Sequence, residues 1–329
     1  MSFDFNFYMH SFKELVGIFA EKFNVPHFPA QPATLYEPGI YFLGIAGKRI
    51  RPVLCLMGNE LFDEIHADAY HVATAIELFH NFTLLHDDIM DKAPLRRGFA
   101  TVHTKYNENT ALLTGDVMLI VAYEYLAKVS PQMLPRIMHL FNRTAREVCE
   151  GQQWDMDFEK RDNVTLEEYI HMIQLKTSVL LAASLKTGAI LGGASEGNCL
   201  HMYEFGRNLG IAFQIQDDYL DAFGDPEKFG KEPGGDIRQN KKTFLLLRAL
   251  EVANPQQKQE LLRLMQENPE DKVEKVLAIF RECQVDAWAR TLKQSYLEKA
   301  HQELEAVAVT GTRKQPLLEL ADFLVAREH

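Results

Sequence analysis

The sequence predicts an all-α protein, a helical assembly around a central cavity. Apolar residues recur at helical spacing in most segments of the 329-residue chain, as in residues 5–24, where Leu15, Phe19 and Phe23 fall on one side. No stretch of useful length alternates apolar and polar residues as a half-buried strand does. Prolines and glycines separate the helical segments. These three observations indicate the all-α class.

The helical segments follow one another from the N-terminus. After the first, Pro26, Pro29, Pro32 and Pro38 are expected to prevent a regular helix and to form a connector. Later helical patterns cover residues 67–91, 107–128, 136–157, 165–194, 243–252, 255–266, 271–281, 285–306 and 315–327. The most apolar run, residues 178–194, is shorter than the roughly 20 residues that a membrane helix needs and is interpreted as a core helix.

Composition limits the partners. The formal net charge of −11 argues against nucleic acid or an anionic membrane surface as a general partner, because like charges repel. The length allows one large domain or two. Four scattered cysteines, without metal-ligand spacing, are expected to be reduced core residues. The first residues lack the features of a secretory signal, so we expect a cytoplasmic protein without an integral membrane segment.

A cluster of carboxylates ends the apolar helical pattern of residues 67–91. Asp87 and Asp91 are four residues apart and share a helix face, with Asp88 to one side. Bare burial of such a cluster is costly, so it requires cations. Arg96 and Arg97 follow closely and can neutralise it, but the same arrangement suits divalent metal ions that bridge to an anionic substrate.

A second cluster repeats this spacing. Asp217, Asp218 and Asp221 again follow an apolar helical run. A solvated helix end explains one such cluster as well as function does, but it explains a matched pair poorly. Oxygen-only ligands favour Mg²⁺ over zinc, and Mg²⁺ is usually bound by one or two carboxylates together with substrate phosphates. The pair therefore predicts a phosphate-bearing substrate.

A basic cluster lies earlier in the chain. Lys48, Arg49 and Arg51 precede Pro52, a residue suited to the first turn of a helix, so the cations should crowd a helix N-terminus, where anions bind. Taken alone, the cluster is better explained as an ordinary solvated basic turn.

With the two aspartate motifs, several further segments complete a pattern: Gly47-Lys48-Arg49-Ile50-Arg51-Pro52, Arg96-Arg97-Gly98, Glu150-Gly151-Gln152, Lys176-Thr177, and the tract from Gly230-Lys231 through Gly235-Asp236-Ile237 to Lys241. In this order and at these spacings the sequence resembles the trans-isoprenyl diphosphate synthases, the head-to-tail prenyltransferase family, over nearly its whole length. The resemblance implies an isoprenoid synthase-type helical bundle, one polyprenyl synthetase domain over residues 1–329, and a homodimer.

The resemblance also implies roles for individual residues. Three Mg²⁺ ions are expected on Asp87, Asp88, Asp91, Asp217 and Asp221, with Asp218 behind them. Cationic partners of the allylic diphosphate are expected to be Lys176, Lys231, Lys241 and Arg96. The diphosphate of isopentenyl diphosphate is assigned to Lys48, Arg51, His80 and Arg97. His80 lies two turns before Asp87 on the same face, although a lone histidine on a helix is more often structural. Thr177 and Gln214 are expected to steady the carbocation.

Product length in this family depends on bulk below the first aspartate motif, where the candidates are Phe82 and Thr83. Phe82 lies about 7.5 Å along the helix axis from Asp87, but a helical wheel turns it away, so it acts from the side or packs in the core. An aromatic here resembles short-chain synthases and predicts C15 to C20 products. The alternatives are a longer-chain polyprenyl diphosphate synthase, a class I terpene cyclase and a non-catalytic synthase subunit. The C-terminal Arg327 resembles a residue that closes over the homoallylic site.

Overall fold

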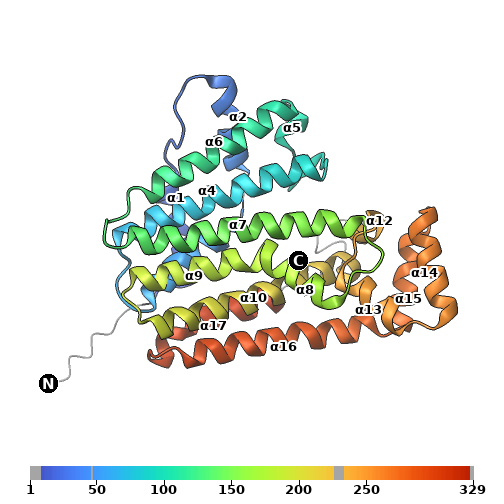
Figure 1. Cartoon of the computed structure of the whole chain (residues 1–329). Helices are drawn as coiled ribbons and strands as arrows, with labels where there is room; N and C mark the ends of the chain where they lie inside the picture. The colour runs from blue at the N-terminus through green and yellow to red at the C-terminus, as the bar shows by residue number, and fades with distance from the viewer. Residues whose placement is uncertain (1–8, 46, 226–232, 327–329) are drawn as a thin grey trace. The chain divides into compact units, whose positions relative to one another are not determined.

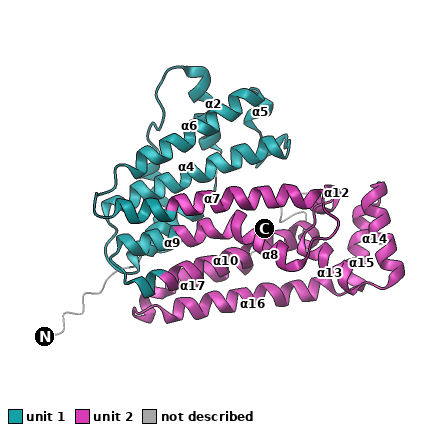
Figure 2. Ribbon diagram, in the orientation of Figure 1, with its two compact units in different colours: residues 1–140, 184–199 teal, residues 141–183, 200–329 magenta. Residues whose placement is uncertain are grey.

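The computed structural model describes residues 9–45, 47–225 and 233–326, and Figure 1 shows their arrangement. Within these residues the regular secondary structure is helical apart from one two-stranded hairpin. The all-α prediction is therefore confirmed. Two compact units can be distinguished, Met1–Leu140 with Ser184–Cys199, and Phe141–Ala183 with Leu200–His329 (Figure 2). They are called unit 1 and unit 2 below, and the single-domain expectation stays a prediction.

Unit 1 holds the first half of the chain. Its elements are α1 (Phe12–Phe23), α2 (Ala33–Gly44), α3 (Ile50–Glu60), α4 (Ala67–Met90), β1 (Leu95–Arg96), β2 (Phe99–Ala100), α5 (Val102–Lys105) and α6 (Glu108–Leu126). Helices α4 and α6 lie side by side (Figure 1). Helix α3 packs on α4. The ends of these helices follow from local capping: Ser11 and Glu14 form a capping box at α1, and Asn107 caps α6.

Helix α2 corrects one sequence-based expectation. We expected Pro38 to belong to an irregular connector, but it lies inside α2 and is buried there. Proline removes a backbone donor and usually kinks a helix interior. Here the neighbouring Gly39 lets Phe28 pack close, since a Cβ at Gly39 would lie 3.1 Å from that ring. Tertiary packing therefore outweighs the intrinsic preference of the segment.

Unit 2 contains most of the second half. Its elements are α8 (Leu166–Ile173), the π-helix η1 (Gln174–Ser178), α12 (Gly235–Arg238), α13 (Phe244–Val252), α14 (Pro255–Glu267), α15 (Lys272–Glu282), α16 (Val285–Ala306) and α17 (Gly311–Ala326). Thr165 and Glu168 cap α8, and Asn254 and Gln257 cap α14. The unit boundaries fall inside α7 (Leu134–Glu159), α9 (Val179–Leu191) and α10 (Glu196–Phe223). The predicted helices from residue 67 onward are confirmed with end shifts of a few residues, except that residues 165–194, expected as one helical stretch, are divided into α8, η1 and α9.

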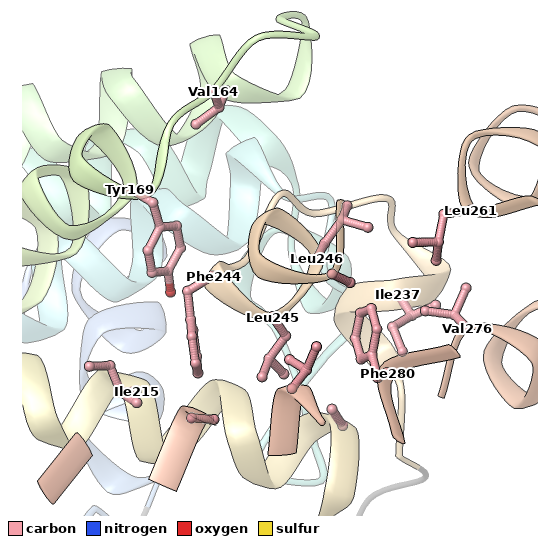
Figure 3. Close-up of a cluster of buried hydrophobic side chains, with 14 of the residues drawn as sticks. Val164, Tyr169, Ile215, Ile237, Phe244, Leu245, Leu246, Leu261, Val276 and Phe280 are labelled. Carbon is pink, nitrogen blue, oxygen red and sulfur yellow. The ribbon is translucent and has the colours of Figure 1, made fainter. Parts of the chain in front are cut away.

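A buried aromatic and aliphatic cluster forms the core of unit 2 (Figure 3). Phe244 and Phe280 are almost fully buried, and Tyr169 from α8 packs beside Phe244 at a ring distance of 6.0 Å. The hydroxyl of Tyr169 is the polar group of this part of the cluster (Figure 3). The core therefore reaches, through Tyr169, the acidic end of α10.

The cysteines differ in their surroundings. Cys55 and Cys199 are buried, as expected, whereas Cys149 is exposed and Cys283 is intermediate, so the core assignment is wrong for Cys149. All four lie among the described residues, and no disulfide joins them. Among the described helices, none combines the length and the apolar character required to cross a membrane.

Candidate active site

The basic cluster of unit 1 gathers at the N-terminus of α3. Arg49, the residue before the helix, has φ of 51°, a left-handed conformation that is uncommon outside glycine. Lys48 is exposed, and Arg51 lies in the first turn. The predicted crowding of cations at a helix N-terminus is confirmed, and the helix dipole adds to their attraction for anions.

Arg51 and His80 form a buried pair. The Nη1 of Arg51 lies 3.1 Å from Nε2 of His80. Because a guanidinium only donates, Nε2 of His80 accepts and the imidazole is neutral. Burial and the neighbouring arginines hold the pKa of His80 well below its usual value. Burial also lowers the pKa of Arg51 to about 10, and its Nε is buried without a hydrogen-bond partner among the described residues. Such an orphan donor fits a bound anion.

Arg97 joins this cluster from the hairpin β1–β2. A Cβ on Gly47 would lie 2.7 Å from Nη1 of Arg97, so the glycine makes room for the guanidinium beside Lys48. Burial and the charge of Arg96 lower the pKa of Arg97. The structure therefore brings Lys48, Arg51, His80 and Arg97 together, four residues that the resemblance assigned to one diphosphate.

Sequence reasoning missed Glu77. This buried carboxylate forms an ion pair with Arg49 and accepts a hydrogen bond from Asn81 Nδ2 at 2.9 Å. Arg49 also donates to the carbonyl of Leu43. Arg49 is thus occupied within the protein. The sequence does contain a signal for this residue: Glu77 is an acid within the apolar helical pattern of residues 67–91, ten residues before Asp87.

The first aspartate motif ends α4. Asp88 is buried, and both of its oxygens accept from Arg96 Nε at 2.8–2.9 Å, with Nη2 2.8 Å from Oδ1. Asp87 is half-buried and Asp91 is exposed one turn later. The side chain of Arg96 therefore neutralises Asp88. A metal role for Asp88 stays a prediction and requires it to share its oxygens with this arginine.

The second motif lies on α10 in unit 2. Asp218 is buried, accepts from the hydroxyl of Tyr169, and accepts from Gln214 Nε2 at 2.8 Å. Burial, and next the charge of Asp236, raise the pKa of Asp218 to about 7. Asp217, on the other hand, is half-buried. Asp218 is therefore more buried than Asp217, and its place behind the metal ligands stays a prediction.

Asp221 has a structural contact that the sequence did not reveal. Its Oδ2 accepts the backbone N–H of Asp236 at 2.9 Å, and its carbonyl accepts from Gly234. Gly234 has φ of 84°, which glycine adopts readily. Asp221 therefore orders the turn that begins α12. Its assignment as a metal ligand stays a prediction.

Lys176 and Thr177 lie on the π-helix η1. Nζ of Lys176 is 2.5 Å from Asp155 Oδ2 on α7, and a Cβ on Gly151 would lie 2.3 Å from the backbone nitrogen of Lys176. Gly151 and Asp155, one turn apart on α7, thus hold this lysine by backbone approach and by charge. Wide turns of this kind are frequent at functional sites, and the sequence did not predict it.

A hydrogen-bonded chain links this turn to α10. Thr177 Oγ1 donates to Gln214 Oε1 at 3.0 Å, and Gln214 in turn donates to Asp218. The structure therefore brings Thr177 and Gln214 together, and their role toward the carbocation stays a prediction. Lys241 lies 3.8 Å from Asp236 Oδ1. Lys231 and Arg327 lie outside the described residues.

The two candidate product-length residues are both half-buried on α4. Phe82 contacts the rings of Phe79 and His86, with centroid distances of 5.7 and 4.7 Å. Thr83 Oγ1 donates to the carbonyl of His80 at 2.8 Å. Phe82 is thus partly accessible and is not a fully buried core residue.

Three or more His, Cys, Asp or Glu side chains do not converge into a metal cage anywhere in the described part of the chain. The donors that fit Mg²⁺ are the oxygens of Asp87 and Asp91 on successive turns of unit 1 and of Asp217 in unit 2. Each unit thus presents acidic and basic groups suited to a metal-bound diphosphate.

Comparison with known proteins identifies the class. The polyprenyl synthetase family model matches residues 32–282. The chain therefore belongs to the polyprenyl synthetase family, the trans-isoprenyl diphosphate synthases.

Individual relatives are similar over almost their full lengths. A short chain isoprenyl diphosphate synthase of Methanothermobacter thermautotrophicus is 38% identical over 91% of this chain and 92% of its own length. A geranylgeranyl diphosphate synthase of Methanosarcina mazei is 37% identical over 91% of both chains. A geranylfarnesyl diphosphate synthase of Natronomonas pharaonis is 33% identical over 91% of this chain and 92% of its own length. The crystal structure of a geranylgeranyl pyrophosphate synthase superposes with a TM-score of 0.92 at 44% sequence identity. The superposition covers 98% of this chain and 100% of that structure's chain.

Proposed function

We propose that this protein is a Mg²⁺-dependent head-to-tail prenyltransferase that condenses isopentenyl diphosphate with an allylic diphosphate to a C15–C20 all-trans product, farnesyl or geranylgeranyl diphosphate. The observation that carries the proposal is the cluster of Lys48, Arg51, His80 and Arg97, with its orphan Arg51 Nε, in a chain that also has both aspartate motifs. The relatives named for geranylgeranyl products support the chain length.

The condensing substrate is assigned to the basic cluster. Lys48 and Arg97 supply charge, and Arg51 offers a buried donor whose neighbour His80 is neutral. Charge-assisted hydrogen bonds to phosphate oxygens are stronger than neutral ones. The cluster binds and orients the diphosphate of isopentenyl diphosphate, whose alkene attacks the allylic cation.

The allylic diphosphate is assigned to the aspartate motifs and their cations. Bound Mg²⁺, three ions by family resemblance, supplies neutralisation of the charge on the leaving pyrophosphate. Asp87, Asp91 and Asp217 would hold it, with Asp88 and Asp221 as further candidates. Lys176, Lys231, Lys241 and Arg96 are the proposed direct cationic partners.

The carbocation is assigned to the oxygen dipoles of Thr177 and Gln214, which are fixed by their mutual hydrogen bond. We assign the final proton to the departing pyrophosphate, so that a side-chain base is not required.

The rivals differ in what they do with two substrates. A class I terpene cyclase ionises one substrate without condensing two, and the second aspartate motif together with the Lys48/Arg51 pair argues against it. A non-catalytic subunit should have lost catalytic residues, whereas the motif residues are present. A longer-chain synthase makes products beyond C25.

One assay separates these readings. The purified chain is incubated with Mg²⁺, an allylic diphosphate and labelled isopentenyl diphosphate, and the dephosphorylated products are chromatographed. We expect C15–C20 alcohols. Products beyond C25 would favour the longer-chain synthase, and no incorporation would favour the cyclase or the subunit.

Replacing Phe82 by Ala should lengthen the product by one or more isoprene units, because it removes the ring proposed to block the growing chain. An unchanged product distribution would contradict the proposed role of Phe82.

We also propose a homodimer. Helix α6 exposes Leu112, Leu113 and Ile120, with exposed fractions of 48, 55 and 57%. Leu113 and Ile120 are two turns apart on one face, and a repeated apolar face of this kind is typical of subunit contacts. Light scattering of wild type and Leu113→Glu tests this proposal, with a monomeric wild type as the contrary result. A cytoplasmic location stays a prediction.

A further inference from the structure

His86 lies between Phe82 and helix α6. It is one turn after Phe82 on α4, and its side chain is only 15% exposed. Its Nε2 is 3.2 Å from the carbonyl of Leu112 and 3.9 Å from Asp116 Oδ1, both on α6. The imidazole therefore rests on the neighbouring helix.

Gly115 makes this close contact between His86 and α6 possible. A Cβ at Gly115 would lie 2.3 Å from Nε2 and 2.5 Å from Cδ2 of His86, far inside van der Waals contact. Glycine in a helix interior is unfavourable relative to alanine, so Gly115 lowers the intrinsic stability of α6 at this position. Its effect is to let the imidazole lie directly on the backbone of α6.

The imidazole also contacts Phe82. The two rings are 4.7 Å apart at 65°, an edge-to-face contact. Phe79 lies one turn before Phe82 on α4, whereas His86 lies one turn after it, and the Phe79 ring is 5.7 Å from the Phe82 ring. Phe79 is buried. Phe82 is therefore held between a core ring and a ring that is itself fixed to α6.

We propose that His86, seated on Gly115, is a positioning residue for Phe82 and thereby a second determinant of product length. This inference rests on the proposed function, which places Phe82 against the growing prenyl chain. A ring held on both sides is a fixed obstacle. Without the imidazole, Phe82 gains the space that His86 occupied and swings aside as the chain grows.

The test is the product distribution of single variants compared at equal total condensation. His86→Ala should raise the ratio of longer to shorter products by about two- to tenfold, the range expected for loss of one aromatic contact. His86→Phe, which keeps a ring against Phe82, should restore the wild-type ratio. His71→Ala, on the same helix but against Tyr125, is the matched control. If His86→Ala does not fold, His86→Asn removes the ring with a smaller loss of polar contact.

A double variant tests the contact between His86 and Gly115. Gly115→Ala should displace the imidazole and change the product ratio, whereas adding it to His86→Ala should change nothing further, because the displaced ring is gone. Independent, additive effects would contradict the inference.

The outcomes separate this inference from the function on which it rests. If Phe82→Ala lengthens the product but His86→Ala does not, His86 has no positioning role and the proposed role of Phe82 stands. If Phe82→Ala has no effect, the product-length assignment itself is wrong. The Mg²⁺ concentration for half-maximal rate should be unchanged in His86→Ala; a shift would mean that His86 acts through Asp87 and would overturn the inference.

Discussion

The two aspartate motifs have the same spacing but different surroundings. In unit 1, the middle carboxylate Asp88 is buried against Arg96, so its charge is neutralised by a guanidinium. In unit 2, the equivalent Asp218 accepts from the neutral donors Tyr169 and Gln214. These hydrogen bonds favour the carboxylate, but burial and the charge of Asp236 outweigh them and raise the pKa of Asp218 to about 7. Identical spacing thus produces one ion-paired carboxylate and one that resists ionisation.

The outer aspartates should behave alike despite this difference. Replacing Asp87 or Asp217 by Ala should lower turnover by about 10²-fold or more, because each removes a group proposed to hold the metal at the leaving group. Turnover is measured at saturating Mg²⁺. Asp63→Ala and Asp162→Ala, at exposed positions in units 1 and 2, are the controls. Near wild-type rates in either motif variant would contradict a mechanism that uses both motifs.

Among the described residues, the basic cluster of Lys48, Arg51, His80 and Arg97 belongs to unit 1, which also holds the first motif, so its loss should affect one substrate. Lys48→Ala and Arg51→Ala should raise KM for isopentenyl diphosphate by about tenfold or more, the effect of losing a charge-assisted hydrogen bond. KM for the allylic substrate should change little. Lys13→Ala, an exposed residue of α1, is the control. An effect confined to the allylic substrate would reverse the assignment.

The middle aspartates should differ in stability. Asp88→Asn leaves Arg96 without its carboxylate and should lower the free energy of unfolding by about 2 kcal/mol, less than for a fully buried pair since Arg96 is partly exposed. Asp218→Asn loses one hydrogen bond and should lower it by about 1 kcal/mol. Urea unfolding without Mg²⁺ measures both. The opposite order would show that the arginine contributes little.

The pH dependence of stability should have opposite signs in the two units. The pKa of His80 is depressed in the folded protein, so the unfolded chain binds the extra proton and stability falls as pH drops below about 6.5. The pKa of Asp218 is raised, so the folded protein retains the proton and stability falls as pH rises from about 4 toward 7. Thermal unfolding across this range should lose the first slope in His80→Gln and the second in Asp218→Asn. Unchanged profiles would mean that neither group is perturbed.

The fold was largely predictable because helical periodicity extends over long segments. Most helices from residue 67 onward begin and end within a few residues of the sequence-based bounds, where capping residues such as Asn107, Thr165 and Asn254 mark the starts. Helix α2 was not predictable, because Pro38 opposes a helix locally and the sequence does not show that Phe28 and Thr114 pack against Gly39.

The site was predictable as a set of residues but less so as a set of contacts. The family resemblance identified Lys48, Arg51, His80 and Arg97, and the structure places them together. Spacing does not show that Arg49 is bound by Glu77 or that Lys176 is held by Asp155, because these partners lie 28 and 21 residues away in the chain. Nor does it reveal that Asp221 caps a turn, since that contact depends on how the segment after α10 folds back.

The π-helix η1 has a consequence for how this segment tolerates insertions and deletions. A π-turn holds one residue more than an α-turn over the same rise, so α8 and α9 are out of register by about 100° relative to one continuous α-helix. Tyr169 and Met172 before the turn, and Val179 and Leu180 after it, are all buried in that offset arrangement. Deleting a single residue from Gln174–Ser178 would restore a regular helix but rotate one of these apolar faces away from its partners. The number of residues in this segment is therefore fixed. By contrast, many substitutions within α8 and α9 would preserve the apolar faces.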